Sequence, residues 1–120
     1  MTAARATVEG TRLTVAATPA DTNEATLYTA GSKGGTVVWL CIANAENAAN
    51  AATVVRRDSS ATTDYPIYTA KSVPANDSVM DGVFLQLDSG DSIKITSGDA
   101  DELTFTITVI ENLGAVGVSG

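Results

Sequence analysis

The strongest hydrophobic pattern lies in residues 36–45, which are apolar at almost every position. The β-branched and aromatic residues of this segment predict a strand between a glycine-rich turn and an Asn/Ala-rich loop. Strand side chains alternate between two faces. The expected faces are Val38, Leu40 and Ile42 on one side, and Val37, Trp39, Cys41 and Ala43 on the other. A strand with two apolar faces needs a second cover, which we expect from a neighbouring subunit, a terminal arm or a loop.

The cleanest alternation is in residues 103–109, where Leu103, Phe105, Ile107 and Val109 should face inward and the intervening threonines outward. Shorter runs bounded by turn residues predict the remaining strands. They are 12–17, 25–29, 52–57, 65–69, 83–87 and 92–97. Pro74 predicts an irregular segment over residues 73–81. About eight short strands without a convincing helix indicate an all-β fold, a compact antiparallel β-sandwich.

The length of 120 residues fits one domain. Within it we expect an N-terminal arm over residues 1–11, a β-sandwich domain over 12–113 and a flexible C-terminal tail over 114–120. No signal peptide and no apolar run of membrane-spanning length is recognisable, so synthesis in the cytoplasm and no membrane partner are expected.

The net charge of −7 argues against nucleic acid as a partner, because binding to phosphates needs a basic surface. Cys41 is the single cysteine and is read as a packing residue of its strand. The chain has no histidine, and no nucleophile elbow, Walker A or dinucleotide motif. The segment 31–35 contains glycines and a lysine, but a strand follows it, so a hairpin turn is predicted. We therefore expect no catalytic site, no cofactor and no enzyme activity.

Acidic residues gather in two turns that flank the strand at 92–97. They are Asp88, Asp91, Asp99, Asp101 and Glu102. Their oxygens could bind calcium, but aspartate is common in turns for local hydrogen bonding, and we favour that interpretation over a metal site.

Three residues are candidate contact residues at an interface. Arg56 and Arg57 are consecutive in a strand and must point to opposite faces, so one should reach toward the interior or a contact surface. The alternative is a strand end where both pair with nearby carboxylates. Trp39 is either core filler or an anchor at a subunit contact.

Several segments together resemble small virion proteins of tailed bacteriophages. These are Thr26-Leu-Tyr-Thr29 with the Gly/Lys turn after it, a strand ending Ile42-Ala-Asn44, Ala51-Ala-Thr-Val54, and Gly90-Asp-Ser-Ile-Lys-Ile95. The resemblance covers residues 25–111, and its motifs are strand-and-turn patterns without chemistry. The chain departs from the commoner form at residues 32–35, which read Ser-Lys-Gly-Gly where a Pro-Ala-Gly-Lys type of turn is usual.

The resemblance implies a jelly-roll-like sandwich that decorates or cements the phage head. On this hypothesis the chain is located in the virion, binds the major capsid protein or other virion proteins, and forms a homo-oligomer, with a trimer favoured. A tail component (tube, baseplate or fibre module) is the nearest alternative. A carbohydrate-binding module, with Tyr65 and Tyr68 as its aromatic residues, is a further one.

Overall fold

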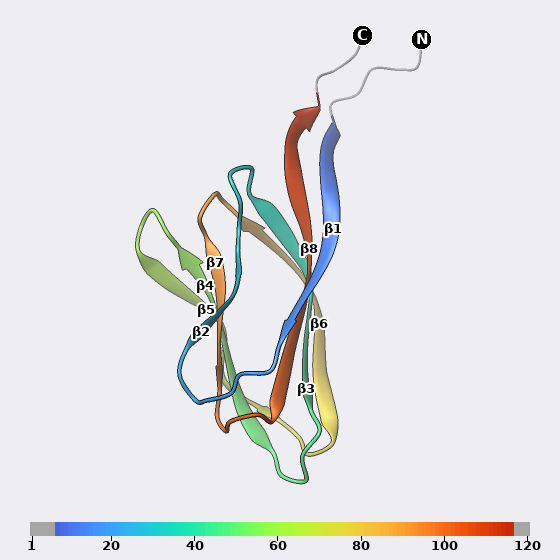
Figure 1. Cartoon of the computed structure of the whole chain (residues 1–120), viewed down its shortest axis with the longest axis vertical. Helices are drawn as coiled ribbons and strands as arrows, with labels where there is room; N and C mark the ends of the chain where they lie inside the picture. Colours follow the sequence, from blue (N-terminus) through green and yellow to red (C-terminus); the bar gives the residue numbers. More distant parts are fainter. Residues whose placement is uncertain (1–6, 117–120) are drawn as a thin grey trace.

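The computed structural model describes residues 7–116, and it folds them into eight β-strands (Figure 1). The all-β prediction is confirmed. The strands are β1 (Thr7–Ala17), β2 (Ala25–Thr29), β3 (Gly35–Asn44), β4 (Asn50–Asp58), β5 (Thr63–Val73), β6 (Asp77–Leu87), β7 (Ser92–Ser97) and β8 (Leu103–Val116). The part of the chain that the structure describes contains no helix long and apolar enough to cross a membrane.

The strands form two four-stranded antiparallel sheets that face each other (Figure 1). We call the sheet with the order β1-β8-β3-β6 sheet A, and the sheet with the order β2-β7-β4-β5 sheet B. Most connections pass from one sheet to the other, and β8 returns to lie between β1 and β3. This interleaved order is the double Greek key of a jelly roll, so the jelly-roll-like sandwich is confirmed.

The core lies between the sheets and is built by the inward side of each alternating strand. On β8 the predicted alternation is confirmed, because Leu103, Phe105, Ile107 and Val109 are all at most 1% exposed. Ile93 and Ile95 of β7 face them from sheet B and are equally buried. Burial of such side chains stabilises the fold by roughly 1.5–3 kcal/mol each.

The faces of β3 differ from the expected grouping at Val37 and Val38. Val37 is buried with Leu40 and Ile42, not exposed with Trp39. The cause is a shift in the pairing between Val37 and Trp39, where β3 has one residue more than β8 and Val38 takes the extra place. A β-bulge of this kind reverses the side-chain alternation beyond it, which a strict period of two does not anticipate.

The prediction of an irregular segment over residues 73–81 is wrong. β5 continues to Val73 and β6 begins at Asp77, so the irregular part shrinks to the turn 74–76 that contains Pro74. Asn44 holds this turn region in place by donating from its side-chain amide to the carbonyl of Val73 at 3.1 Å. The proline therefore ends one strand without preventing the next.

β1 and β8 pair beyond the expected limits of the sandwich domain. Their register runs from Ala17 opposite Phe105 to Thr7 opposite Val116, whereas β3 stops at Gly35. The two strands therefore continue as a ribbon past the rest of sheet A (Figure 1). The predicted arm and tail include residues 1–6 and 117–120, which lie outside the described residues.

Candidate interaction surface

The outer face of sheet A is a broad surface of small, polar and apolar side chains. Residues directly opposite in an antiparallel pair share a face, so the pairing register identifies its members. Besides Arg12 at its margin, they are Thr14, Ala16, Thr36, Trp39, Cys41, Ala43, Ser78, Met80, Gln86, Thr104, Thr106, Thr108 and Ile110. Among the described side chains of this face, Arg12 is the only charged one.

Trp39 lies at the centre of this surface. It pairs with Gly82 of β6 on one side and Thr108 of β8 on the other. A Cβ placed on Gly82 would lie 4.0 Å from the six-membered ring of Trp39, so the indole covers the glycine in ordinary van der Waals contact. Trp39 remains 41% exposed, so this large apolar residue contacts Gly82 and is also open to solvent.

Met80 and Phe84 extend the apolar area along the edge strand β6. Met80 is 56% exposed and lies opposite Cys41. Phe84 is 75% exposed, and both of its chain neighbours, Val83 and Leu85, face the core. Sequence reasoning missed Met80 because it treated residues 73–81 as irregular, and it missed Phe84 because it assigned no faces to the predicted strand 83–87. The alternation of residues 79–87 with apolar groups in the outward positions was the available signal.

The outer face of sheet B is different, because it carries ion pairs. Arg57 contacts Asp64 at 3.1 Å, and Lys94 contacts Glu24 at 3.5 Å. The molecule as a whole has a net charge of −7. The outer face of sheet A is therefore the broad face on which a partner meets the fewest charges.

Arg56 points to the inner side of sheet B, at the end of the sandwich. Its guanidinium contacts the carboxylate of Asp91 at 3.3 Å, and its Cζ lies 5.8 Å from the ring centre of Tyr65. Asp91 also accepts hydrogen bonds from the backbone N–H groups of Ser59 and Asp88, both at 3.0 Å. This pair ties the turn after β4 to the turn before β7.

The three predicted contact residues do not lie on one surface. Trp39 is on the outer face of sheet A, Arg57 on the outer face of sheet B, and Arg56 on the inner side of sheet B. Each arginine has a carboxylate partner within the chain, which matches the alternative that the sequence left open. Their role at an interface stays a prediction.

The acidic turns at the ends of β7 are separated by the length of that strand. Asp91 belongs to the arginine pair described above, while Glu102 accepts a hydrogen bond from the side chain of Asn50 at 3.0 Å. Desolvation, then the nearby Asp99 and Glu46, raise the pKa of Glu102 above its ordinary value. Among the described residues, no three His, Cys, Asp or Glu side chains are grouped to hold a metal ion.

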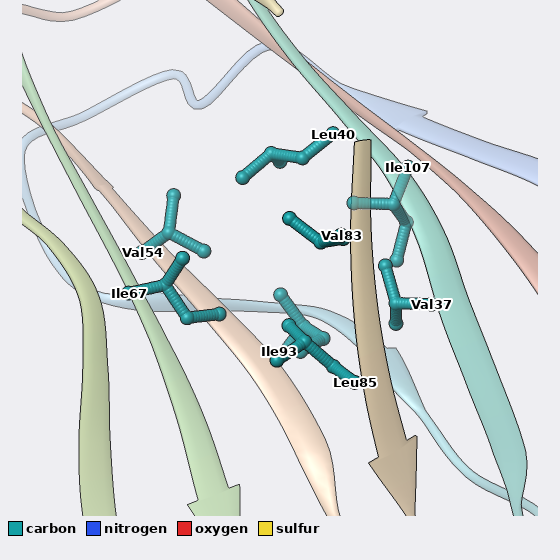
Figure 2. A pocket seen from close by; sticks show the side chains of 8 residues that line it. All are labelled: Val37, Leu40, Val54, Ile67, Val83, Leu85, Ile93 and Ile107. Atoms are coloured by element: carbon teal, nitrogen blue, oxygen red, sulfur yellow. The ribbon is translucent and has the colours of Figure 1, made fainter. Parts of the chain in front are cut away.

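The space between the sheets on the β5–β6 side is filled. Figure 2 shows eight apolar side chains that point into it from both sheets. They are Val54, Ile67 and Ile93 from sheet B, and Val37, Leu40, Val83, Leu85 and Ile107 from sheet A. The gap among them has no room for a single water molecule, so it is part of the packed core and offers no ligand site.

Tyr65 and Tyr68, the candidate sugar-binding residues, each interact with a cation of their own strand pair. The guanidinium of Arg56 approaches Tyr65, and the Nζ of Lys71 lies 6.0 Å from the ring centre of Tyr68. Both distances are typical of cation–π contacts. The two rings are therefore partly engaged within the chain.

No protein-family model and no curated protein sequence matches the chain. Solved structures match it by fold. One chain from the capsid of Helicobacter pylori bacteriophage KHP30 superposes with a TM-score of 0.61 at 10% identity, covering 97% of this chain and 98% of its own length. A chain of the disulfide-linked pili of Bacillus endospore appendages superposes with a TM-score of 0.56 at 16% identity, covering 95% of this chain and 96% of its own length.

The nucleoplasmin-like N-terminal domain of Drosophila FKBP39 gives a TM-score of 0.51 at 13% identity, covering 90% of this chain and 95% of that domain. At these identities the similarity shows a common fold. Its occurrence in a phage capsid, a bacterial appendage and an insect domain agrees with the rule that one fold serves many functions.

Proposed function

We propose that the chain is a non-enzymatic structural protein of a bacteriophage virion that binds the assembled head as a decoration or cement protein. The observation that carries this proposal is the outer face of sheet A, where Trp39, Met80 and Phe84 are exposed and uncharged in an acidic molecule. Apolar patches with aromatic residues are typical of protein–protein contacts. The resemblance of residues 25–111 to small virion proteins supports the choice of partner.

The proposed mechanism is mass action. A protein that binds the assembled shell and not its free subunits stabilises the shell by an amount that grows with its concentration. The chain would act as a small symmetric oligomer that ties neighbouring capsid subunits together by added buried area. This role requires exposed apolar groups on a rigid scaffold, and Trp39 and Met80 lie on paired strands of sheet A.

The test uses empty shells assembled from the major capsid protein of the same phage, prepared without this chain. We expect the purified protein to co-sediment with the shells, to saturate a fixed number of sites and to raise the temperature at which the shells dissociate. Absence of binding at saturating concentration would remove the head-decoration function.

Two substitutions locate the contact. Phe84→Ser and Met80→Gln should lower shell occupancy, while Tyr65→Ser should leave it unchanged, because Tyr65 is similarly exposed but lies on sheet B. Equal occupancy for all three variants would show that another surface meets the shell.

A tail component is the second candidate function. It is supported by the fold similarity to a chain of a pilus, an assembly built by linear repetition. Rings or fibres of the purified protein under the electron microscope, together with no binding to shells, would favour this alternative.

A further inference from the structure

The edges of the two sheets are not equally protected. An edge strand exposes unpaired N–H and C=O groups that can pair with another strand, and proteins block such pairing with short strands, prolines, bulges or charges. The edges here are β1 and β6 in sheet A, and β2 and β5 in sheet B.

Three edges carry these protective features. β2 has five residues and a register shift after Thr26. β5 contains Pro66 and has two register shifts against β4. β6 has a register shift beside Gly82, and its charged Asp81 pairs opposite the core residue Leu40, on the inward side of the edge.

β1 lacks most of them. From Gly10 to Ala17 it pairs with β8 without a register shift, and this segment contains no proline and one charge, Arg12. Its core-side residues are also incompletely covered. Leu13 and Val15 are half-buried, although the β8 residues opposite them are at most 1% exposed. The backbone and the apolar side of β1 are thus both open to a further strand.

We propose that β1 pairs edge to edge with β1 of a second copy, antiparallel about a two-fold axis, so that sheet A continues across two subunits. An isologous contact requires only one surface, which must be complementary to itself. A strand satisfies this condition, because an antiparallel copy of the same strand supplies the missing backbone partners.

The distribution of charge favours antiparallel over parallel pairing of the two β1 strands. The loops 18–24, 45–49 and 98–102 lie at the end of the sandwich toward which β1 runs, and every charged residue in them is acidic. An antiparallel pair places this acidic end of one copy beside the opposite end of the other (Figure 1), where Lys33 lies in the loop before β3 and the turn before β7 carries Asp88 and the paired Asp91. The two ends whose loops carry only acidic charges are thereby kept apart in a molecule of net charge −7.

The proposal does not depend on a role in a virion and is tested on the purified full chain. The measurement is mass by light scattering and analytical ultracentrifugation over a range of concentrations. We expect a two-fold dimer. Thr14→Lys should raise its dissociation constant by about tenfold or more, because it places lysines from both copies beside the shared edge.

Thr108→Lys is the matched control. Thr108 lies directly opposite Thr14, on the same outer face but one strand further in, so the same substitution leaves the edge unaltered. The far-ultraviolet circular dichroism of both variants should equal that of the wild type. Amide exchange at residues 11–17 of the wild type, which needs no variant, should slow as the concentration rises.

The mass measurements on the wild type and the two variants decide between pairing through β1 and other contacts. A dimer that Thr14→Lys dissociates and Thr108→Lys does not supports the pairing of β1 edges. A monomer at all concentrations overturns it. A trimer, the state expected from the resemblance to virion proteins, also overturns it, because a two-fold contact does not form a trimer. A dimer dissociated only by Thr108→Lys would place the contact on the outer face of sheet A and also overturns the proposal.

Discussion

The carboxylate of Asp91 is the partner of the guanidinium of Arg56, at 3.3 Å, and the two residues join turns at the same end of the sandwich. Asp91 is 1% exposed, whereas the Arg56 side chain is 26% exposed. The aspartate therefore acts as a buried acceptor that collects one guanidinium and two backbone N–H groups. Burial of a carboxylate is tolerated in proteins only with such a set of donors.

Replacement of Asp91 by alanine should therefore be strongly destabilising. It leaves the N–H groups of Ser59 and Asp88 without their acceptor and removes the partner of Arg56, so we expect a loss of about 3 kcal/mol in the free energy of unfolding. Asp64→Ala, which breaks the exposed pair with Arg57, should cost less than about 1 kcal/mol. Urea denaturation of both variants makes the comparison, and equal losses would contradict the structural role assigned to Asp91.

The hydroxyl of Tyr28 in β2 donates a 2.6 Å hydrogen bond to the carboxylate of Glu111 in β8, and so connects the two sheets. Burial, followed by the hydrogen bond and the charge of Glu111, raises the pKa of Tyr28 above its ordinary value of 10.0. The unfolded chain then releases this proton at lower pH than the folded protein does. Stability should consequently be complete below about pH 10 and fall as the pH rises further.

The pH test compares the wild type with Tyr28→Phe. The variant should lose about 1–2 kcal/mol near neutral pH, because a hydrogen bond to a charged acceptor is absent. Above about pH 10 the difference between the two proteins should shrink, by up to about 1.4 kcal/mol per pH unit. Chemical denaturation at several pH values measures the difference in the free energy of unfolding between the two proteins. A difference that stays constant up to about pH 11.5 would count against the raised pKa of Tyr28.

Gly34 requires its glycine, whereas Gly31 in the same loop does not. Gly34 has φ = 73°, and a Cβ there would overlap the carbonyl oxygen of Leu87. A Cβ on Gly31 would meet nothing within 4 Å. We expect Gly34→Ala to lower the thermal midpoint by roughly 5 °C or more, and Gly31→Ala to leave it nearly unchanged. Similar midpoints for the two variants would indicate that the turn adapts freely.

The hydrophobic pattern predicted the fold class and most strands because one face of each is buried, which imposes a period of two. It was right for β7 and β8, where the pairing has few irregularities. The pattern failed where an irregularity in strand pairing decided which side chains face the core. The bulge at Val38 arises from the way β3 fits β8 and β6 together, and local sequence does not encode that fit.

The candidate surface could be predicted only in part. Trp39 was recognised as either core filler or a contact residue, because it lies in a strand whose two apolar faces need a second cover. Phe84 was not, since the exposure of a phenylalanine depends on which face its strand presents to the core. Whether Arg56 and Arg57 have partners depends on Asp91 and Asp64, of which Asp91 comes from a distant turn that the fold brings into contact.

Trp39 is the single tryptophan of the chain and provides a direct reporter for the proposed surface. Its indole is 41% exposed, so its emission should resemble that of a partly solvated ring. When a partner covers the outer face of sheet A, water is excluded from the ring, and the emission maximum should shift to shorter wavelength. Pairing through β1 should not produce this shift, because β8 separates β1 from β3.

Fluorescence during titration with empty shells therefore separates the two surfaces. We expect a saturable blue shift on addition of shells and none when the protein alone is concentrated. Phe84→Ser should weaken the shift in proportion to its loss of binding, whereas Tyr65→Ser, on sheet B, should leave it unchanged. A shift on self-association alone would mean that Trp39 lies in the contact between copies, because only burial of the ring by a second subunit would then explain it.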